Sequence, residues 1–346
     1  MLVVHSPKHA LHHPVEVMRL GRFGPARDVP RRIEVLVAAL AAAGHALVEP
    51  AADHGPAPVE AMHTARYLDF LATAHAQWSA LPGAARDVLP HTFATRDMTA
   101  YPTSVVGRAG FHMQDLVAPI GAGTFEAAMA AANVAVDAAE RLIAGERAVY
   151  ALCRPSGHHA YADMGGGATY LNNAAIAANH LAARLGRVAL IDVDVHHANG
   201  TQSHFYARGD VFTVSLHRDP HDYWPYLIGY AGETGEGTGH GLNLNLPLPA
   251  GSDDETYLAA LETACRRIAA FAPAALVVSA GYDAHVDDPS AGLAVTEAGF
   301  RRIGGRLGAL GLPTLLVQEG GYNCDTLGGL AAAFTDGFEA AHGAGG

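Results

Sequence analysis

Val188-Ala-Leu-Ile-Asp192-Val-Asp194-Val-His196-His197-Ala-Asn199 is the stretch that decides the fold of this chain. Its first four residues form an apolar run, which is typical of a buried strand in a parallel sheet. The polar residues follow together at the carboxyl end of that strand, where α/β sheets bind their ligands. The sequence therefore predicts a functional site at one edge of a parallel sheet.

Six other apolar runs have the same strand-like character, and Ala-rich stretches separate many of them. The predicted strands lie at residues 2–4, 148–152, 211–216, 242–246, 275–279 and 314–317. The predicted helices lie at residues 31–43, 125–144, 172–185, 253–271 and 296–310. This alternation indicates a parallel sheet with helices on both faces. No linker divides the chain, so we expect a single domain over residues 1–346.

Residues 78–113 break the alternation. They are rich in Pro, Thr, Arg and Gly and show no clear periodicity. A loop of this length in a compact domain is usually functional or forms an interaction surface. We therefore expect a long loop insertion here.

Asp194 and His196 have the spacing and chemistry of metal ligands. In an extended segment, side chains two residues apart leave the same side of the backbone. Carboxylate and imidazole are the usual ligands of zinc other than thiolate, and iron(II) or cobalt also accepts them. Asp283 follows another predicted buried strand, so it would converge with this pair if the two strands are near neighbours. The alternative is a buried ion-pair network.

Two further strand ends carry polar residues. Cys153-Arg-Pro-Ser-Gly-His158-His159 follows one strand, and its paired histidines suggest acid/base chemistry beside a metal. Gln318-Glu-Gly-Gly-Tyr322 follows another, and its glycines suggest a phenol held on flexible backbone. A packing role for Tyr322 is the alternative.

Composition narrows the class of protein. No apolar run approaches the roughly 20 residues that span a bilayer, and the first residues lack the long apolar region of a signal peptide. We therefore expect a cytoplasmic protein with no membrane partner. The three cysteines are widely spaced, which argues against a disulfide framework or a thiolate zinc site. The net charge of -12 disfavours nucleic acid and favours cationic substrates.

At this point the chain resembles the histone deacetylase and acetylpolyamine amidohydrolase superfamily, which has the arginase/deacetylase fold. The matching segments come in the family's order over nearly the whole chain. They are Arg154-Pro-Ser-Gly-His-His159, residues 192–202, Val214-Ser-Leu-His217, Ser279-Ala-Gly-Tyr-Asp283 with Asp288-Pro289, and Glu319-Gly-Gly-Tyr322. Residues 229–235 and Gly123-Thr-Phe-Glu126 resemble the bacterial acetylpolyamine amidohydrolases most closely. The resemblance implies a deacetylase-like catalytic domain with three α/β/α layers and a mostly parallel sheet of about eight strands.

The resemblance also implies roles for the polar residues. One zinc ion would be bound by Asp194, His196 and Asp283. His158 would pair with Asp192 and carry charge, whereas His159 would pair with the neutral Asn199 and act as general base and then acid. The hydroxyl of Tyr322 would help to polarise the acyl carbonyl. A structural potassium ion would bind the Asp192 carboxylate, the Ser215 hydroxyl and the backbone carbonyls of Asp194, His196 and Leu216.

The substrate tunnel departs from the family pattern. Trp224 takes the place of one aromatic wall, but Gly167 and Ala168 stand where the opposite wall is usually aromatic. Val117 stands where polyamine-specific members have an acidic residue, and Asp115 is the nearest carboxylate. We therefore expect a broader substrate range than acetylpolyamines alone.

The expected function is a metal-dependent amidohydrolase that removes an acetyl or other acyl group from an amine. The expected substrate is a small cationic acylated amine or an acyl-lysine, and we expect a homodimer formed through residues 78–113. One alternative is an arginase-like hydrolase with two manganese ions, for which Asp283-Ala-His285-Val-Asp287 offers extra ligands. The other is a non-catalytic protein that binds acyl-amines.

Overall fold

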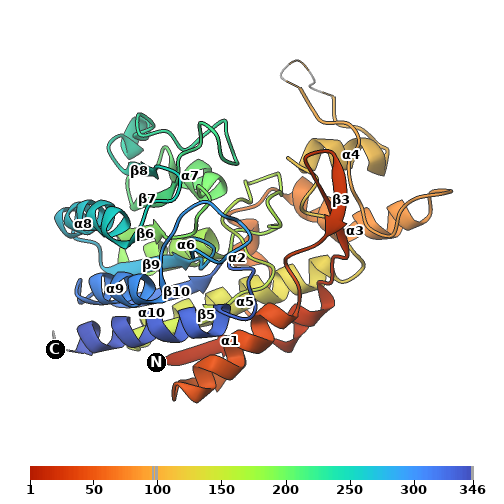
Figure 1. The fold of residues 1–346 in the computed structure, drawn as a ribbon. Helices are drawn as coiled ribbons and strands as arrows, with labels where there is room; N and C mark the ends of the chain where they lie inside the picture. Colours follow the sequence, from red (N-terminus) through yellow and green to blue (C-terminus); the bar gives the residue numbers. More distant parts are fainter. Residues whose placement is uncertain (96, 98–99, 344–346) are drawn as a thin grey trace.

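A parallel sheet of eight strands forms the centre of the computed structural model, which describes residues 1–95, 97 and 100–343 (Figure 1). Its strand order is β4-β1-β5-β10-β9-β6-β7-β8, and every neighbouring pair is parallel. The strands are β1 (Leu2–His5), β4 (Ala46–Val48), β5 (Ala148–Leu152), β6 (Val188–Asp192), β7 (Val211–Arg218), β8 (Asn243–Leu248), β9 (Ala275–Ala280) and β10 (Thr314–Gln318).

Helices cover both faces of the sheet, because alternate strand residues point to opposite sides. In β6, Val188 and Leu190 belong to one apolar core, and Ala189 and Ile191 belong to the other. The first core contains α2 (Ala57–Glu60), α3 (Ala65–Ser79), α4 (Val105–His112), α5 (Thr124–Ile143), α6 (Asn173–Leu185) and α7 (Asn199–Phe205). The second contains α1 (Arg31–Ala42), α8 (Asp254–Phe271), α9 (Glu297–Gly308) and α10 (Leu327–His342). The predicted three-layer α/β/α fold is confirmed.

All seven predicted strands and all five predicted helices are present. The spacing of apolar residues did not predict the shorter or glycine-rich elements. The three residues of β4 are too few to show a period. In α10, glycines weaken the helical signal. They are needed there, because a Cβ atom at Gly337 would lie 2.0 Å from the Arg301 carbonyl oxygen of α9.

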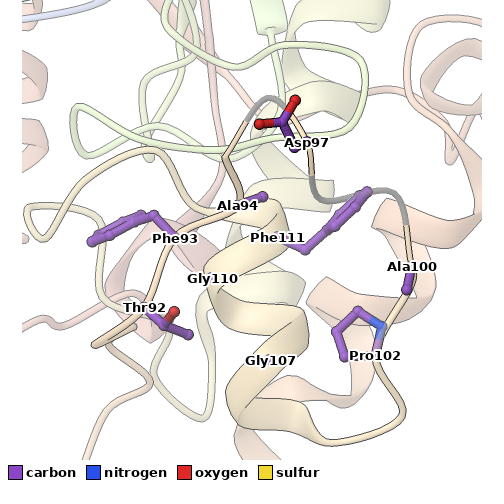
Figure 2. A pocket seen from close by; sticks show the side chains of 9 residues that line it. All are labelled: Thr92, Phe93, Ala94, Asp97, Ala100, Pro102, Gly107, Gly110 and Phe111. Atoms are coloured by element: carbon purple, nitrogen blue, oxygen red, sulfur yellow. The ribbon is translucent and has the colours of Figure 1, made fainter.

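The prediction for residues 78–113 was wrong in two respects. Trp78 and Ser79 belong to α3, and α4 lies inside the segment. Positions 96, 98 and 99 lie outside the described residues. This segment encloses a cavity of about 420 Å³. Figure 2 shows the residues that line it, which are Thr92, Phe93, Ala94, Asp97, Ala100, Pro102, Gly107, Gly110 and Phe111. Within the described ranges, no helix has the length and apolar character needed to cross a bilayer.

A two-stranded hairpin, β2 (Glu16–Arg19) and β3 (Arg22–Pro25), lies outside the main sheet. Its two turn residues, Leu20 and Gly21, have φ angles of 50° and 73°. Positive φ at both positions is the geometry of a type I′ turn, which matches the twist of hairpin strands. The backbone N–H of Met18 donates to the Leu116 carbonyl at 3.0 Å, so the hairpin is tied to the segment that follows α4.

Candidate functional site

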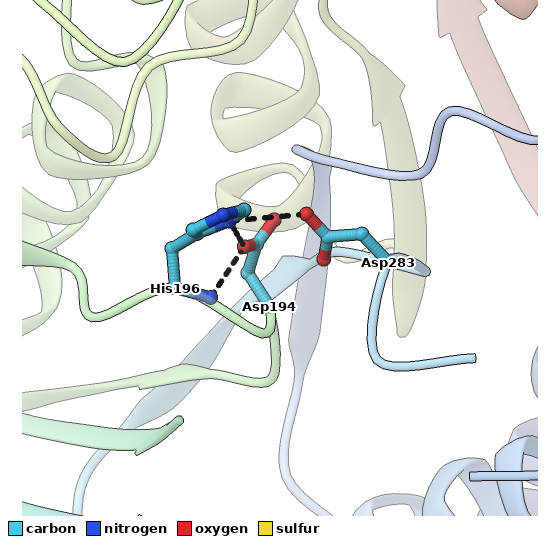
Figure 3. Close-up of side chains that lie close together, drawn as sticks. All are labelled: Asp194, His196 and Asp283. Carbon is cyan, nitrogen blue, oxygen red and sulfur yellow. Dashed lines mark hydrogen bonds and ion pairs between the residues drawn. The ribbon is translucent and has the colours of Figure 1, made fainter. Parts of the chain in front are cut away.

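Asp194, His196 and Asp283 meet just beyond the carboxyl ends of β6 and β9. These strands are neighbours in the sheet, with Asp192 opposite Ser279, so the segments that follow them emerge side by side. One ligand atom from each side chain lies within 4.8 Å of the other two. The Nδ1 atom of His196 is 3.0 Å from an Asp194 oxygen and 3.2 Å from an Asp283 oxygen (Figure 3).

The donor set of this cluster fits one divalent cation. Both carboxylates are fully buried, and among the described residues the contact of Oδ2 of Asp283 with a polar side chain is the ion pair with Nδ1 of His196. Burial and the neighbouring Asp194 charge raise the pKa of Asp283 to about 7, which reflects the repulsion between the two carboxylates. Gly320 leaves room for them, because a Cβ atom there would lie 2.4 Å from an oxygen of each. Two carboxylates and an imidazole suit zinc, with a further position open.

The two adjacent histidines have different partners. Nδ1 of His158 lies 3.0 Å from an Asp192 carboxylate oxygen, and Nδ1 of His159 lies 2.6 Å from the Asn199 side-chain oxygen. Burial alone would lower the pKa of His158, but nearby carboxylates, Asp192 foremost, raise it to about 10. Burial and the charges of His158 and His196 hold the pKa of His159 well below its ordinary value. Near neutral pH, His158 is therefore charged and His159 is neutral.

The residues of the predicted potassium site adjoin one another at the sheet edge. Asp192 of β6 is the register partner of Ser215 of β7, and Leu216 is the next residue along β7. The Asp192 carboxylate also accepts a hydrogen bond from the Asp194 backbone N–H at 2.9 Å. The Ser215 hydroxyl lies 2.8 Å from Nδ1 of His217. A buried carboxylate and a hydroxyl therefore lie beside the backbone segments of the predicted site.

Tyr322 follows a turn that is held from two sides. Its backbone N–H donates to the Asp288 carboxylate at 2.7 Å. The Arg32 guanidinium lies 4.8 Å from the centre of the Tyr322 ring and donates to the Gly321 carbonyl at 2.6 Å. Burial and the Asp283 charge raise the pKa of Tyr322 well above its ordinary value. The phenol therefore keeps its proton and can donate a hydrogen bond.

His159, His196 and Tyr322 line one cavity of about 470 Å³, which we call the site cavity. Its lining includes His159, Gly167, Ala168, His196, Tyr223, Trp224 and Tyr322, together with Met18, Arg19, Leu20, Arg27, Asp115, Leu116, Val117, Tyr226, Pro289 and Ser290. The Trp224 ring stands edge-on to His159, with centroids 4.3 Å apart. A Cβ atom at Gly167 would lie 2.3 Å from the His159 ring and 2.8 Å from Trp224, so position 167 has no room for a side chain. The predicted tunnel residues thus line the same cavity as His196 of the metal cluster.

Several supporting residues were not predicted. Arg32 left no signal in the sequence, because its contacts at the site go to backbone carbonyls. Gln114 links the pair formed by His159 and Asn199, since its amide donates to the His159 carbonyl and accepts from the Asn199 amide. Glu319 lay in a quoted strand end without an assigned role, and its carboxylate accepts from the backbone N–H groups of Gly157 and His158.

The extra ligands of the arginase-like alternative do not form a second cluster. Nδ1 of His285 accepts a hydrogen bond from the Asp287 backbone N–H at 3.2 Å, so it faces its own loop. Among the described residues, Asp194, His196 and Asp283 form the only group of this kind.

A parallel sheet between two helical layers, with a cluster of metal-ligand residues at its carboxyl edge, is the α/β architecture of the deacetylases. The profile of the histone deacetylase domain matches residues 26–338, and the chain belongs to that family.

The similar proteins include bacterial amidohydrolases. The acetylpolyamine amidohydrolase of Burkholderia pseudomallei (strain 1710b) is 44% identical over 343 residues, which cover 99% of this chain and 100% of the relative. That of Mycoplana ramosa is 39% identical and covers 95% of this chain and 96% of the relative. The crystal structure of acetylpolyamine aminohydrolase from Burkholderia pseudomallei superposes with a TM-score of 0.95 at 44% identity and covers 99% of both chains.

Proposed function

We propose that this chain is a zinc-dependent amidohydrolase that removes an acetyl or other acyl group from a small acylated amine, such as an acetylpolyamine, or from an acyl-lysine. The observation that carries the proposal is the cluster of Asp194, His196 and Asp283, whose His196 lines one cavity together with His159 and Tyr322. The names of the acetylpolyamine amidohydrolases that it resembles support the same reaction.

Each side chain has a distinct part in amide hydrolysis. Zinc at Asp194, His196 and Asp283 would polarise the acyl carbonyl and acidify water, and iron(II) or cobalt would suit the same ligands. Neutral His159 accepts a proton from the attacking water and returns it to the nitrogen of the leaving amine. Charged His158 orients the reacting groups and stabilises negative charge. Tyr322 donates a hydrogen bond to the oxygen that becomes negative as water attacks.

A structural potassium ion and a dimer complete the proposal. The buried Asp192 carboxylate and the Ser215 hydroxyl, with the backbone carbonyls of Asp194, His196 and Leu216, would bind the potassium ion. Residues 78–113 would form a homodimer interface. The support for the interface is the resemblance to the bacterial amidohydrolases, together with Phe93, which remains 38% exposed beside the cavity of Figure 2.

The test of zinc dependence compares two carboxylate variants. Asp283→Asn keeps the shape of the side chain but removes a ligand charge, so bound zinc and turnover of an acetylated diamine should both fall by at least about a hundredfold. Asp222→Asn changes an exposed carboxylate that pairs with Arg218, and it should leave both unchanged. Zinc is measured by elemental analysis and turnover by release of the free amine. Full turnover by the chelated, metal-free protein would exclude the proposal.

A further inference from the structure

Arg19 is a cation at the outer end of the site cavity, and the charge of Asp115 is an attractive one nearby. It is the last residue of β2 and lines the cavity next to Leu20, which is 98% exposed, so the hairpin turn lies at the mouth. Its guanidinium has no hydrogen-bond or ion-pair partner among the described residues. A half-buried guanidinium with five free N–H donors is a ready site for an anion.

A second guanidinium reinforces this charge. Arg27 lines the same cavity and donates one hydrogen bond, to the Pro289 carbonyl at 2.9 Å, so other donors remain available. Burial and the charge of Arg27 lower the pKa of Arg19, which shows that the two cations are close enough to repel each other. An anionic ligand placed between them would relieve this repulsion.

Asp115, the carboxylate that lines the cavity near Arg19, already accepts hydrogen bonds from the backbone. The donors are the backbone N–H groups of Val117 at 2.9 Å and Gly167 at 2.7 Å. Burial raises the pKa of this carboxyl, which weakens it further as a partner for an ammonium group. Among the described residues that line the cavity outside the catalytic cluster, the charges are therefore two cations and one occupied carboxylate.

We propose that the site cavity takes acyl-amines whose far end carries a carboxylate, that is, ω-amino acids acylated on the amino group, in preference to acylated polyamines. The net charge of -12 does not oppose this, because charges beyond about 8 Å are largely screened at physiological salt, whereas the arginines line the cavity itself. The proposal rests on the proposed function. It identifies the substrate class of the same site, and the hydrolysis itself is unchanged: water adds to the acyl carbon, the C–N bond breaks and the amine nitrogen gains a proton.

The test uses three substrates with the same five-carbon chain, which differ only in charge at the far end. They are 5-acetamidopentanoate with a carboxylate, N-acetylcadaverine with an ammonium and N-acetylpentylamine with a methyl group. With the zinc-loaded enzyme, kcat/KM for the carboxylate should exceed that for the ammonium substrate by at least about tenfold, because hydrogen bonds to charged groups are strong. The neutral substrate reports whether the catalytic groups work at all.

Two arginine variants test whether the far-end carboxylate of the substrate binds at Arg19. Arg19→Gln should abolish the preference, so that kcat/KM for the carboxylate substrate falls to about that for the ammonium substrate. Arg22→Gln is the matched control, because Arg22 is the partner of Arg19 across the hairpin but is exposed and does not line the cavity. It should keep the preference. If Arg22→Gln removes the preference as fully as Arg19→Gln, the carboxylate does not bind at the mouth and the inference is wrong.

The outcomes separate this inference from the proposed function. If the neutral substrate is hydrolysed and kcat/KM for the ammonium substrate equals or exceeds that for the carboxylate substrate, the inference is wrong and the proposed function stands. If none of the three substrates is hydrolysed, the proposed function fails. The inference is then tested by calorimetric measurement of 5-acetamidopentanoate binding to the metal-free protein. It requires that Arg19→Gln weakens this binding by at least about tenfold and that Arg22→Gln leaves it unchanged.

Discussion

At the scale of single residues, a charged or neutral partner sets the chemistry of each histidine. His158 and His159 are adjacent, with ring centroids 3.8 Å apart, yet their pKa values are shifted in opposite directions. The difference follows from a carboxylate at Asp192 and an amide at Asn199. The family resemblance predicted these partners, which both lie in the stretch that follows β6 or at its end. The sequence could not predict Gln114 or Arg32, whose contacts with backbone atoms leave no sequence pattern.

Asn199→Asp should move the pH dependence of the reaction. In the natural protein the pKa of His159 is lowered, so the base stays neutral and active until the solution is well below pH 6.5. A carboxylate at position 199 would stabilise the protonated ring and raise that pKa. The acid limb of kcat/KM should therefore shift to higher pH. Asn179→Asp on α6 is the control and should leave the acid limb where it is. If the acid limb does not move in Asn199→Asp, His159 is not the general base.

Tyr322→Phe should lower kcat by about 10²- to 10³-fold with little change in KM, because the lost hydrogen bond forms in the transition state. Tyr223→Phe is the matched control. Tyr223 lines the same cavity, but its hydroxyl donates to the Ser290 carbonyl at 2.8 Å, away from the reaction. Its loss should reduce the free energy of unfolding by about 1 kcal/mol and barely affect kcat. Equal effects on kcat would show that Tyr322 has no specific role.

At the scale of elements, the buried strands were predictable and the loops that complete the site were not. In β6 and β9 every residue is buried, so their apolar runs stand out in the sequence. The loop at Gly167 and Ala168 depends on φ angles of 58° and 63° and on contacts with the distant Trp224. Neither property gives a periodic pattern, so only the family resemblance pointed to this wall.

Gly167→Ala and Ala168→Gly should differ in their effect on kcat, although the two residues are adjacent and both have a left-handed backbone conformation. A methyl group at 167 would collide with the His159 ring, so we expect kcat to fall by at least about tenfold as the base is displaced. Glycine at 168 relieves the strain of an alanine at positive φ, and the free energy of unfolding should change by less than about 1 kcal/mol. Steady-state kinetics and thermal melts measure both. Comparable kinetic loss in the two variants would mean that the loop, and not the contact with His159, controls activity.

At the scale of the whole molecule, the layers follow from the sequence but its assembly does not. Alternating strands and helices predict a sheet covered on both faces, because each apolar face must be buried against another element. An interface between two chains depends on which surface remains exposed after folding. Residues 78–113 keep Phe93 partly exposed, next to a close contact in which a Cβ atom at Gly110 would lie 2.0 Å from the Thr92 carbonyl oxygen. The proposed homodimer would bury the Phe93 ring.

Phe93→Asp should therefore convert a homodimer to a monomer, because a charge buried in an apolar interface has no partner and is strongly unfavourable. Sedimentation velocity over a range of protein concentrations measures the mass of the particle. Leu185→Asp is the matched control, since Leu185 at the end of α6 is 37% exposed, almost the same as Phe93 at 38%, but lies outside residues 78–113. It should remain dimeric. A wild-type protein that stays monomeric at all concentrations, or a Phe93→Asp protein that stays dimeric, would refute an interface centred on Phe93.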